Sequence, residues 1–204
     1  MSLAGGYPPS VSKLIEEFAK LPGIGLRTAE RLALYLLELP TQEAMALALA
    51  IRDMKKSIKP CSICFNLSDT DPCHICSDPD RDRSVICVVE ERREVASIES
   101  SGAFNGLYHV LMGRLAPLEG VQESDLTIEP LKKRLASKEV KEIILATNPT
   151  LEGDATATLI AERLKDSGVK ISRLARGVPQ GAKLDHVSSA IIADALKGRT
   201  KVQQ

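Results

Sequence analysis

Four cysteines lie within one short segment of the chain, and thiolates are strong ligands for zinc. Cys61 and Cys64 form one Cys-x-x-Cys pair, and Cys73 and Cys76 form a second pair after eight intervening residues. Two such pairs make tight turns that direct four sulfur atoms at one tetrahedral ion. Because four thiolates leave no position open for water or a substrate, we expect one structural Zn²⁺ per chain and no catalytic metal here.

Other features of this region have structural interpretations. Reduced cysteines gathered by chance are the alternative to a metal site, but so small a segment has no other evident use for four of them. His74 lies inside the second pair, and we expect it at the surface because the sulfurs already fill the site. Cys87 lies in the apolar run 85–89, which favours a small buried side chain over a reactive thiol.

A second candidate site is the turn Leu21-Pro-Gly-Ile-Gly25, which separates two segments with helical periodicity. Glycine permits positive φ and lets backbone N–H groups approach an anion, while the following helix presents its positive N-terminal end. A plain helix end explains the glycines alone equally well, but three nearby cations favour a binding site for a DNA phosphate. Binding at such a site should not depend on the DNA sequence. The candidate DNA-binding residues are Lys20, Gly23, Gly25, Arg27 and Arg31.

Three carboxylates form a third group. Glu90 follows the apolar run 85–89, and Glu152 and Asp154 follow the run 142–146. Neighbouring parallel strands bring such residues to one edge of a sheet, where they can hold Mg²⁺ for phosphoryl transfer. Asp154 is equally well placed to cap the next helix. An enzyme would also need a general base or nucleophile, and His109, the nearest candidate, has no evident partner.

The spacing of apolar residues along the chain predicts the helices and strands that position these residues. Residues 10–58 are predicted to be helical, and the last helix covers about 41–56. Residues 59–78 are too few and too polar to form a core without a metal ion. Later segments alternate between strands and helices, which predicts an α/β fold with a parallel sheet. The strands are predicted at 84–89, 142–146 and 169–174, and the helices at 154–166 and 187–197.

Composition excludes several classes of protein. The chain has 204 residues, with 27 basic and 27 acidic side chains, and no apolar run approaches the roughly 20 residues that span a bilayer. Aromatic residues make up only 3% of the chain, too few for a surface that mainly stacks unpaired bases. The N-terminal stretch lacks the features of a secretory signal, so we expect a reducing cytoplasm.

Taken together and in order, these motifs resemble those of the bacterial RecR recombination mediator family, over about residues 8–184. The segments that carry the resemblance are 21–25 (LPGIG), the two cysteine pairs, 86–90 (ICVVE), 106–111 (GLYHVL), 146–150 (ATNPT), 152–156 (EGDAT) and 175–179 (ARGVP). The resemblance implies a multidomain α/β protein. It would comprise a helix-hairpin-helix module in 1–58, a four-cysteine zinc finger in 59–78, a Toprim-like parallel β/α domain in 79–175 and a C-terminal helical arm in 176–204.

The same resemblance implies a non-enzymatic repair protein that forms a ring-like homo-oligomer, a dimer or a tetramer. Such a protein binds duplex, gapped or single-stranded DNA and acts with RecO and RecF to load RecA on gapped DNA. Arg27 and Arg31 match positions implicated in DNA contact, and Glu152 lies in the acidic patch implicated in partner binding. We therefore group Glu90, Glu152 and Asp154 as candidate partner-binding residues.

Two other classes compete with this interpretation. A Mg²⁺-dependent Toprim phosphoryl-transfer enzyme, similar to a nuclease or a topoisomerase, would use the same three carboxylates on DNA. A zinc-finger transcription factor ranks last, because the span between the cysteine pairs is too short for a base-reading helix.

Overall fold

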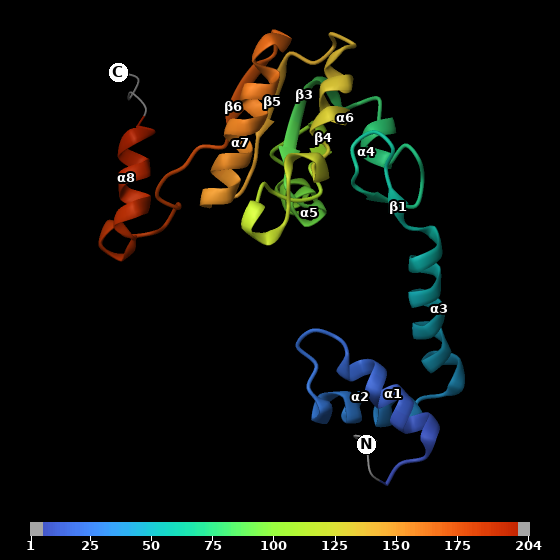
Figure 1. Cartoon of the computed structure of the whole chain (residues 1–204). Helices are drawn as coiled ribbons and strands as arrows, with labels where there is room; N and C mark the ends of the chain where they lie inside the picture. The colour runs from blue at the N-terminus through green and yellow to red at the C-terminus, as the bar shows by residue number, and fades with distance from the viewer. Residues whose placement is uncertain (1–5, 200–204) are drawn as a thin grey trace. The chain divides into compact units, whose positions relative to one another are not determined.

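The chain divides into two compact units, Met1–Ile58 and Lys59–Gln204, and each is described by itself (Figure 1). The structure is a computed structural model that describes residues 6–199. The predicted domains 1–58 and 176–204 each include a few terminal residues outside this range. The finer division of the second unit at residues 78 and 175 stays a prediction.

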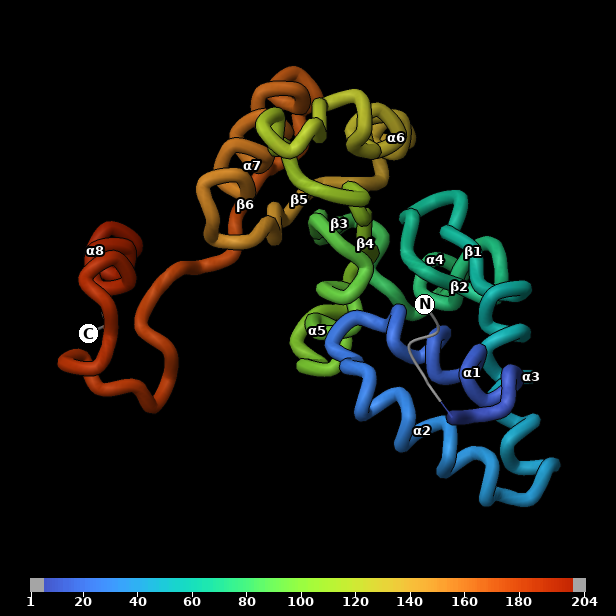
Figure 2. The backbone as a smooth tube through the Cα atoms, turned by 60° about the horizontal axis from the view of Figure 1, so that its bottom comes forward, coloured from blue at the N-terminus to red at the C-terminus, as the bar shows by residue number. Residues whose placement is uncertain are grey.

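Three helices make up the first unit, namely α1 (Pro9–Ala19), α2 (Leu26–Glu38) and α3 (Thr41–Ser57). α1 and α2 pack against each other around Ile15, Ala29 and Ala33, which are all buried. The two alanines allow a close approach of the helices because they add little side-chain bulk. Figure 2 traces the short connection from α1 to α2, which contains the predicted glycine turn.

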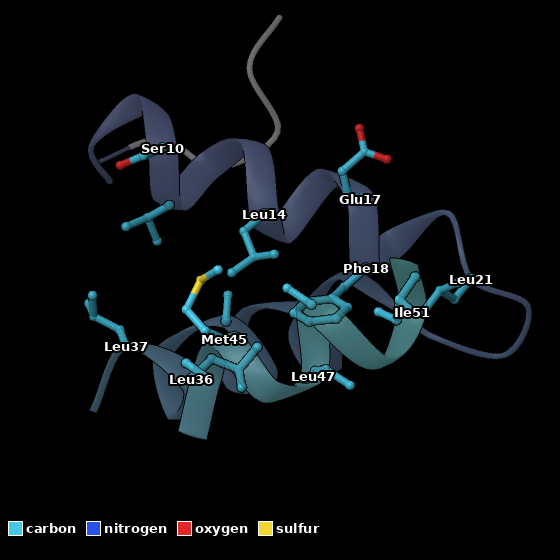
Figure 3. A pocket seen from close by; sticks show the side chains of 14 residues that line it. Ser10, Leu14, Glu17, Phe18, Leu21, Leu36, Leu37, Met45, Leu47 and Ile51 are labelled. Atoms are coloured by element: carbon cyan, nitrogen blue, oxygen red, sulfur yellow. The ribbon is translucent and has the colours of Figure 1, made fainter. Parts of the chain in front are cut away.

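The third helix is less well covered than the first two. α3 buries none of its residues, and its side chains Met45 and Met54 are 50% and 53% exposed. With α1 and α2 it lines an apolar pocket of about 560 Å³, in which Leu14 and Met45 point toward one another (Figure 3). The apolar side predicted for residues 41–56 is thus only partly covered within this unit.

The second unit begins with the cysteine segment. Two short antiparallel strands, β1 (Lys59–Pro60) and β2 (Leu67–Ser68), enclose the first cysteine pair. Of the second pair, Cys73 is the N-cap of the one-turn helix α4 (His74–Ser77) and Cys76 lies within it. The segment has little regular structure of its own, as expected for a small metal-dependent unit.

Four strands form the sheet that follows, in the order β4-β3-β5-β6. They are β3 (Asp82–Val89), β4 (Gly106–Val110), β5 (Glu142–Leu145) and β6 (Lys170–Arg173). All neighbouring strands are parallel, and Cys87 on β3 lies opposite Tyr108 on β4 and Ile144 on β5. The predicted strands at 84–89, 142–146 and 169–174 correspond to β3, β5 and β6, so the α/β fold class is confirmed.

Helices connect these strands and complete the core. They are α5 (Arg92–Ser101), α6 (Ile128–Leu135) and α7 (Leu151–Leu164), and α8 (Ser189–Lys197) follows the sheet. Val88, Ile143 and Ile160 are fully buried between the sheet and α7 and its neighbours. Cys87 is buried as predicted. None of the helices within residues 6–199 is long and apolar enough to cross a membrane.

Candidate metal centre, DNA interface and partner surface

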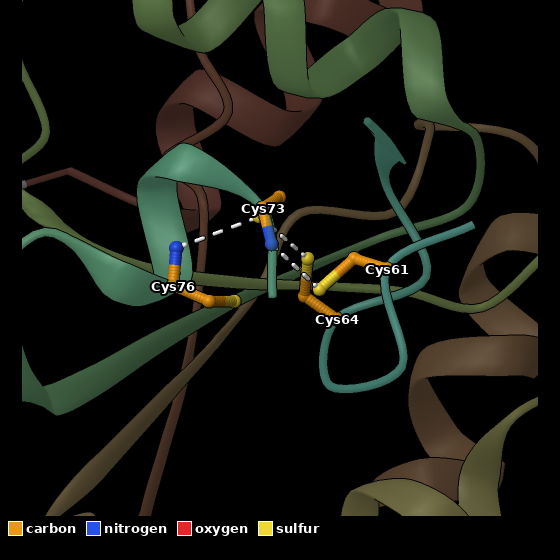
Figure 4. A group of neighbouring side chains, drawn as sticks. All are labelled: Cys61, Cys64, Cys73 and Cys76. Atoms are coloured by element: carbon orange, nitrogen blue, oxygen red, sulfur yellow. Dashed lines mark hydrogen bonds between the residues drawn. The ribbon is translucent and has the colours of Figure 1, made fainter. Parts of the chain in front are cut away.

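The four cysteine side chains converge on one point (Figure 4). Their Sγ atoms lie within 4.8 Å of one another, and all four residues are buried. Tetrahedral zinc with Zn–S bonds of about 2.3 Å requires sulfur atoms about 3.8 Å apart, which this cluster can supply with small adjustments. The Sγ atoms of Cys64 and Cys73 are already 3.5 Å apart. The donor set therefore fits a four-thiolate metal site.

Local backbone geometry prepares the sulfurs for a metal ion. The backbone N–H groups of Ile63 and Cys73 donate to Cys61 Sγ, and that of Cys76 donates to Cys73 Sγ, each at 3.4 Å. Hydrogen bonds to the charged form favour a thiolate. Bonding from the Cys76 thiol, and from the Asn66 backbone, lowers the pKa of Cys64. Burial raises the pKa of Cys73, and the hydrogen bond to Cys64 raises the pKa of Cys76, so without a metal ion the negative charge gathers on Cys64. His74 is exposed, as predicted.

Hydrogen bonds to main-chain carbonyls of the cysteine segment attach it to the sheet and its neighbouring residues. The Val110 N–H, at the end of β4, donates to the Cys64 carbonyl at 2.9 Å. Arg92 donates from Nε to the carbonyl of Phe65 at 3.1 Å, and Arg83 donates to the carbonyl of Cys76 at 3.3 Å. β4 is one of the two edge strands of the sheet, so the cysteine segment also covers part of an edge that would otherwise be open.

The glycine turn of the first unit has the form expected of an anion site. Gly23 adopts a φ of 80°, a conformation that side chains disfavour. Gly25 differs from the expectation, because its φ is −78° and it serves instead as the N-cap of α2. No side chain among the described residues caps this helix end. Its first N–H groups therefore remain free to meet an anion.

Two arginines stand on the first turns of α2. Arg27 and Arg31 are exposed, one turn apart, and no carboxylate within residues 6–199 lies within ion-pair distance of either. Like charges at this spacing repel each other mildly, so an anion between them is favoured. Lys20 is different, because its ammonium already pairs with Glu17 at 2.8 Å. Such an exposed pair is weak and does not prevent Lys20 from turning to a phosphate.

The structure gives Glu90 a buried, internal position. It is 2% exposed, and its carboxylate accepts hydrogen bonds from the backbone N and the side-chain Nδ2 of Asn148, both at 2.8 Å. Gly153 packs tightly here, because a Cβ at this position would lie 2.1 Å from the Asn148 carbonyl oxygen. Glu90 therefore joins β3 to the start of α7. As a surface contact for a partner it is a wrong choice, since its oxygens face the protein interior.

A second carboxylate missed by the sequence reasoning completes this cluster. Glu94 accepts from the backbone N–H groups of Glu90 and Glu91, at 2.8 and 2.9 Å, and from Asn148 Nδ2 at 2.6 Å. Glu91 and Glu94 form a capping box at the start of α5, which a Glu three residues after a polar residue can signal. These oxygens are used by protein donors, so the arrangement does not favour a Mg²⁺ site.

Glu152 and Asp154 occupy the first turn of α7 in different states. Glu152 is half-buried, and no cation among the described residues pairs with it. Asp154 binds the guanidinium groups of Arg173, at 2.6 Å, and Arg176. Hydrogen bonds from Arg176 and Arg173 lower the pKa of Asp154 to about 2. The expected cap role of Asp154 is wrong, because Thr150 is the N-cap and accepts from the Gly153 N–H.

Three family models match successive parts of the chain. The model for the RecR helix-hairpin-helix matches residues 11–55, that for the four-cysteine zinc finger domain of RecR matches 58–78, and that for the Toprim domain matches 84–175. The fold and sites thus define a protein with a helix-hairpin-helix, a four-cysteine metal-binding finger and a Toprim domain, in the predicted order.

Relatives resemble the chain over nearly its whole length. A protein named Recombination protein RecR from Rhodopirellula baltica is 48% identical over 97% of this chain and 99% of its own. Proteins of the same name from Carboxydothermus hydrogenoformans and Heliobacterium modesticaldum are 52% and 50% identical, over 95% and 96% of this chain and 97% and 98% of their own. The chain belongs to the RecR family. Its relatives share the name of a recombination protein, in agreement with the expectation of a non-enzymatic recombination protein.

Proposed function

We propose that this protein is a recombinational repair mediator that binds DNA without sequence preference and holds one structural Zn²⁺. The similarity to RecR proteins over nearly the full chain carries this proposal. On this proposal, the protein closes around DNA as a ring-like homo-oligomer and acts with RecO and RecF to load RecA on gapped DNA. Its reduced cysteines suit a cytoplasmic location.

The uncapped start of α2 supports the DNA part of the proposal. The free N–H groups after Gly25 and the unpaired charges of Arg27 and Arg31 can meet one phosphate from two sides. Lys20 and Gly23 lie in the adjoining turn, where the positive φ of Gly23 brings the backbone close to the same point. No feature of this turn is suited to reading base edges, so binding should depend on charge and salt.

Titration of gapped duplex DNA at several salt concentrations tests the DNA site. The double variant Arg27→Ala with Arg31→Ala should bind more weakly, and its slope of log K against log salt should fall by about 0.9 for each lost phosphate contact. Arg52→Ala is a matched control, because Arg52 is an exposed cation of the same unit that already pairs with Asp53. If the double variant and the Arg52→Ala control have equal slopes, the DNA site does not include Arg27 and Arg31.

Glu152 is the best candidate for contact with a protein partner. Its carboxylate is partly exposed and unpaired within the described residues, so a cationic partner group can reach it. Asp154 lies beside it but is already bound by Arg173 and Arg176, so we propose that it shapes the surface. We assign the RecO contact to Glu152.

A further inference from the structure

A four-cysteine zinc site buries charge. One Zn²⁺ ion with four thiolates carries a formal double negative charge, and the four cysteines of this chain are at most 5% exposed. Such a charge is costly to bury unless hydrogen bonds and cations offset it. The three backbone N–H groups that point at the sulfurs offset a part. The surroundings should therefore contain a cation that has no other partner.

Arg134 on α6 has this property. Its guanidinium is partly buried and donates from one NH group to the Tyr108 carbonyl at 2.6 Å and to His109 Nδ1 at 3.2 Å. Both acceptors are uncharged, and no carboxylate within residues 6–199 lies within ion-pair distance of Arg134. Tyr108 and His109 directly precede Val110, whose N–H donates to the Cys64 carbonyl at 2.9 Å, so Arg134 lies against the end of β4 to which the cysteine segment is bonded. In agreement with this position, burial lowers the pKa of Arg134 and the charges of the cysteines oppose that lowering.

His109 holds the arginine in place as a neutral acceptor. Because a guanidinium can only donate, Nδ1 of His109 accepts, and Nε2 carries the proton and donates to the Thr127 carbonyl at 2.9 Å. Burial, and then the charge of Arg134, lower the pKa of His109 to about 3, so the ring stays neutral. The ring also packs edge-on against Phe65, the residue after Cys64, with centroids 5.5 Å apart.

The packing of α6 fixes where Arg134 can reach. Leu131 and Leu135, on the same helix, are buried in the core of the second unit, so the helix cannot rotate without exposing them. Arg134 thus comes from the Toprim domain and not from the finger. A link between the two is already visible in the bond from the Val110 N–H to the Cys64 carbonyl.

We propose that Arg134 is the counter-charge of the metal-loaded cysteine cluster, through which the Toprim domain raises the zinc affinity of the finger. This inference rests on the proposed zinc site. A cation placed near the sulfurs stabilises the doubly negative loaded site but gives little to the unloaded site, in which most thiols are protonated. Removing the outer partners of metal ligands typically lowers metal affinity about 10- to 100-fold.

Competition for zinc with the chromophoric chelator 4-(2-pyridylazo)resorcinol tests the proposal. Arg134→Gln, which removes the charge, should lose zinc about 10- to 100-fold more readily than the parent. Arg134→Lys, which keeps the charge but not the planar fork, should stay closer to the parent. Lys133→Gln is the matched control, because Lys133 is an exposed cation on the same helix and should leave the zinc affinity unchanged.

Thermal unfolding with zinc and with excess chelator separates a counter-charge from simple packing. Arg134→Gln should lower the melting temperature of the zinc-loaded protein and leave that of the chelated protein nearly unchanged. Equal losses in both forms, or equal zinc affinities for Arg134→Gln and Lys133→Gln, would overturn the role of Arg134. Metal analysis of the parent comes first, since a parent without zinc would refute the proposed zinc site itself and this inference with it.

Discussion

Single residues of the cysteine cluster differ in what surrounds them, although all four are proposed ligands. Cys61 and Cys73 receive backbone N–H bonds at the sulfur, while Cys64 is held by its carbonyl, which accepts from Val110 on β4. Substitution of the Cys64 side chain removes one ligand and keeps this backbone bond to the sheet. We therefore expect the effect of such a substitution to come from the lost metal ligand.

Cys64→Ser should lose zinc and melt at a lower temperature than the parent, because structural zinc contributes on the order of 10 kcal/mol to the folding of such segments. Metal analysis and thermal unfolding measure both effects. Cys87→Ala is the control: Cys87 is buried on β3, outside the cluster, so this variant should keep its zinc. Full zinc occupancy in Cys64→Ser would contradict the four-thiolate assignment.

Among the elements of the second unit, the start of α7 collects most of the polar contacts. Thr150 caps the helix, and Glu90 accepts from Asn148 just before it. Asp154 binds Arg173 at the end of β6 and Arg176 beyond that strand. This arrangement follows from the parallel order of β3, β5 and β6, which places their carboxyl ends at one edge. Only Glu152 of this group is left with a reachable, unpaired carboxylate in the described chain.

Glu152→Lys should weaken association with RecO without altering zinc content or DNA binding. An interfacial charge that loses its partner typically costs about 2 to 5 kcal/mol. Titration calorimetry against RecO measures the change, and circular dichroism checks the fold. Glu162→Lys is the control, because Glu162 is an exposed carboxylate on the same helix. If the two variants bind RecO with equal affinity, Glu152 is not part of the partner surface.

Asp154 should hold the segment after β6 in a pH-independent way over most of the acid range. Its pKa is lowered from 3.8 to about 2 by Arg176 and Arg173, so its contribution is complete above the unfolded pKa and is lost only as the pH falls through about 2. Hydrogen exchange of the Leu174 N–H, which donates to the Leu145 carbonyl at 3.4 Å, should give equal protection at pH 5 and pH 7.

The matching substitution is Asp154→Asn, which removes the charge that binds both arginines. It should reduce the protection of the Leu174 N–H at pH 7 and speed trypsin cleavage after Arg176. Glu129→Gln, which affects an exposed pair with Lys132 on α6, should do neither. Protection that already falls between pH 7 and pH 5 in the parent would show that another group controls this segment.

At the scale of the whole molecule, an open apolar surface lies on the first unit. Leu37, Met45 and Ile51 are 67%, 50% and 52% exposed around the pocket between the three helices. Apolar groups gathered in this way are commonly covered by another protein surface. This exposure is consistent with the proposed homo-oligomer.

Light scattering should give a mass that is a multiple of the 22.1 kDa chain. Leu37→Glu with Met45→Glu should lower that mass, because a buried interface would then contain unpaired carboxylates. Leu118→Glu is the control, since Leu118 is fully exposed on the second unit. A monomeric parent at micromolar concentration, with or without DNA, would contradict the ring-like assembly.

Local patterns were sufficient to predict the metal site and the main strands. The spacing of Cys61, Cys64, Cys73 and Cys76 predicts a common site because two tight turns need no distant residues to bring sulfurs together. The continuous apolar runs of β3 and β5 predict buried parallel strands, because strands covered on both faces have no polar side. Apolar periodicity does not predict α5 and α6, because the first is mostly polar and the second is short and contains Pro130.

Contacts between residues far apart in the chain could be known only from the tertiary structure. Glu90 and Asn148 are 58 positions apart, and only the pairing of β3 with β5 shows that Glu90 is an internal bond and not a surface carboxylate. Asp154 and Arg176 likewise form an ion pair because β5 and β6, which precede them, are neighbouring strands. The pairing of Arg134 with His109 arises when α6 packs beside β4. Sequence spacing encodes local turns and periodic faces, whereas the environment of a buried charge is set by which strands and helices become neighbours.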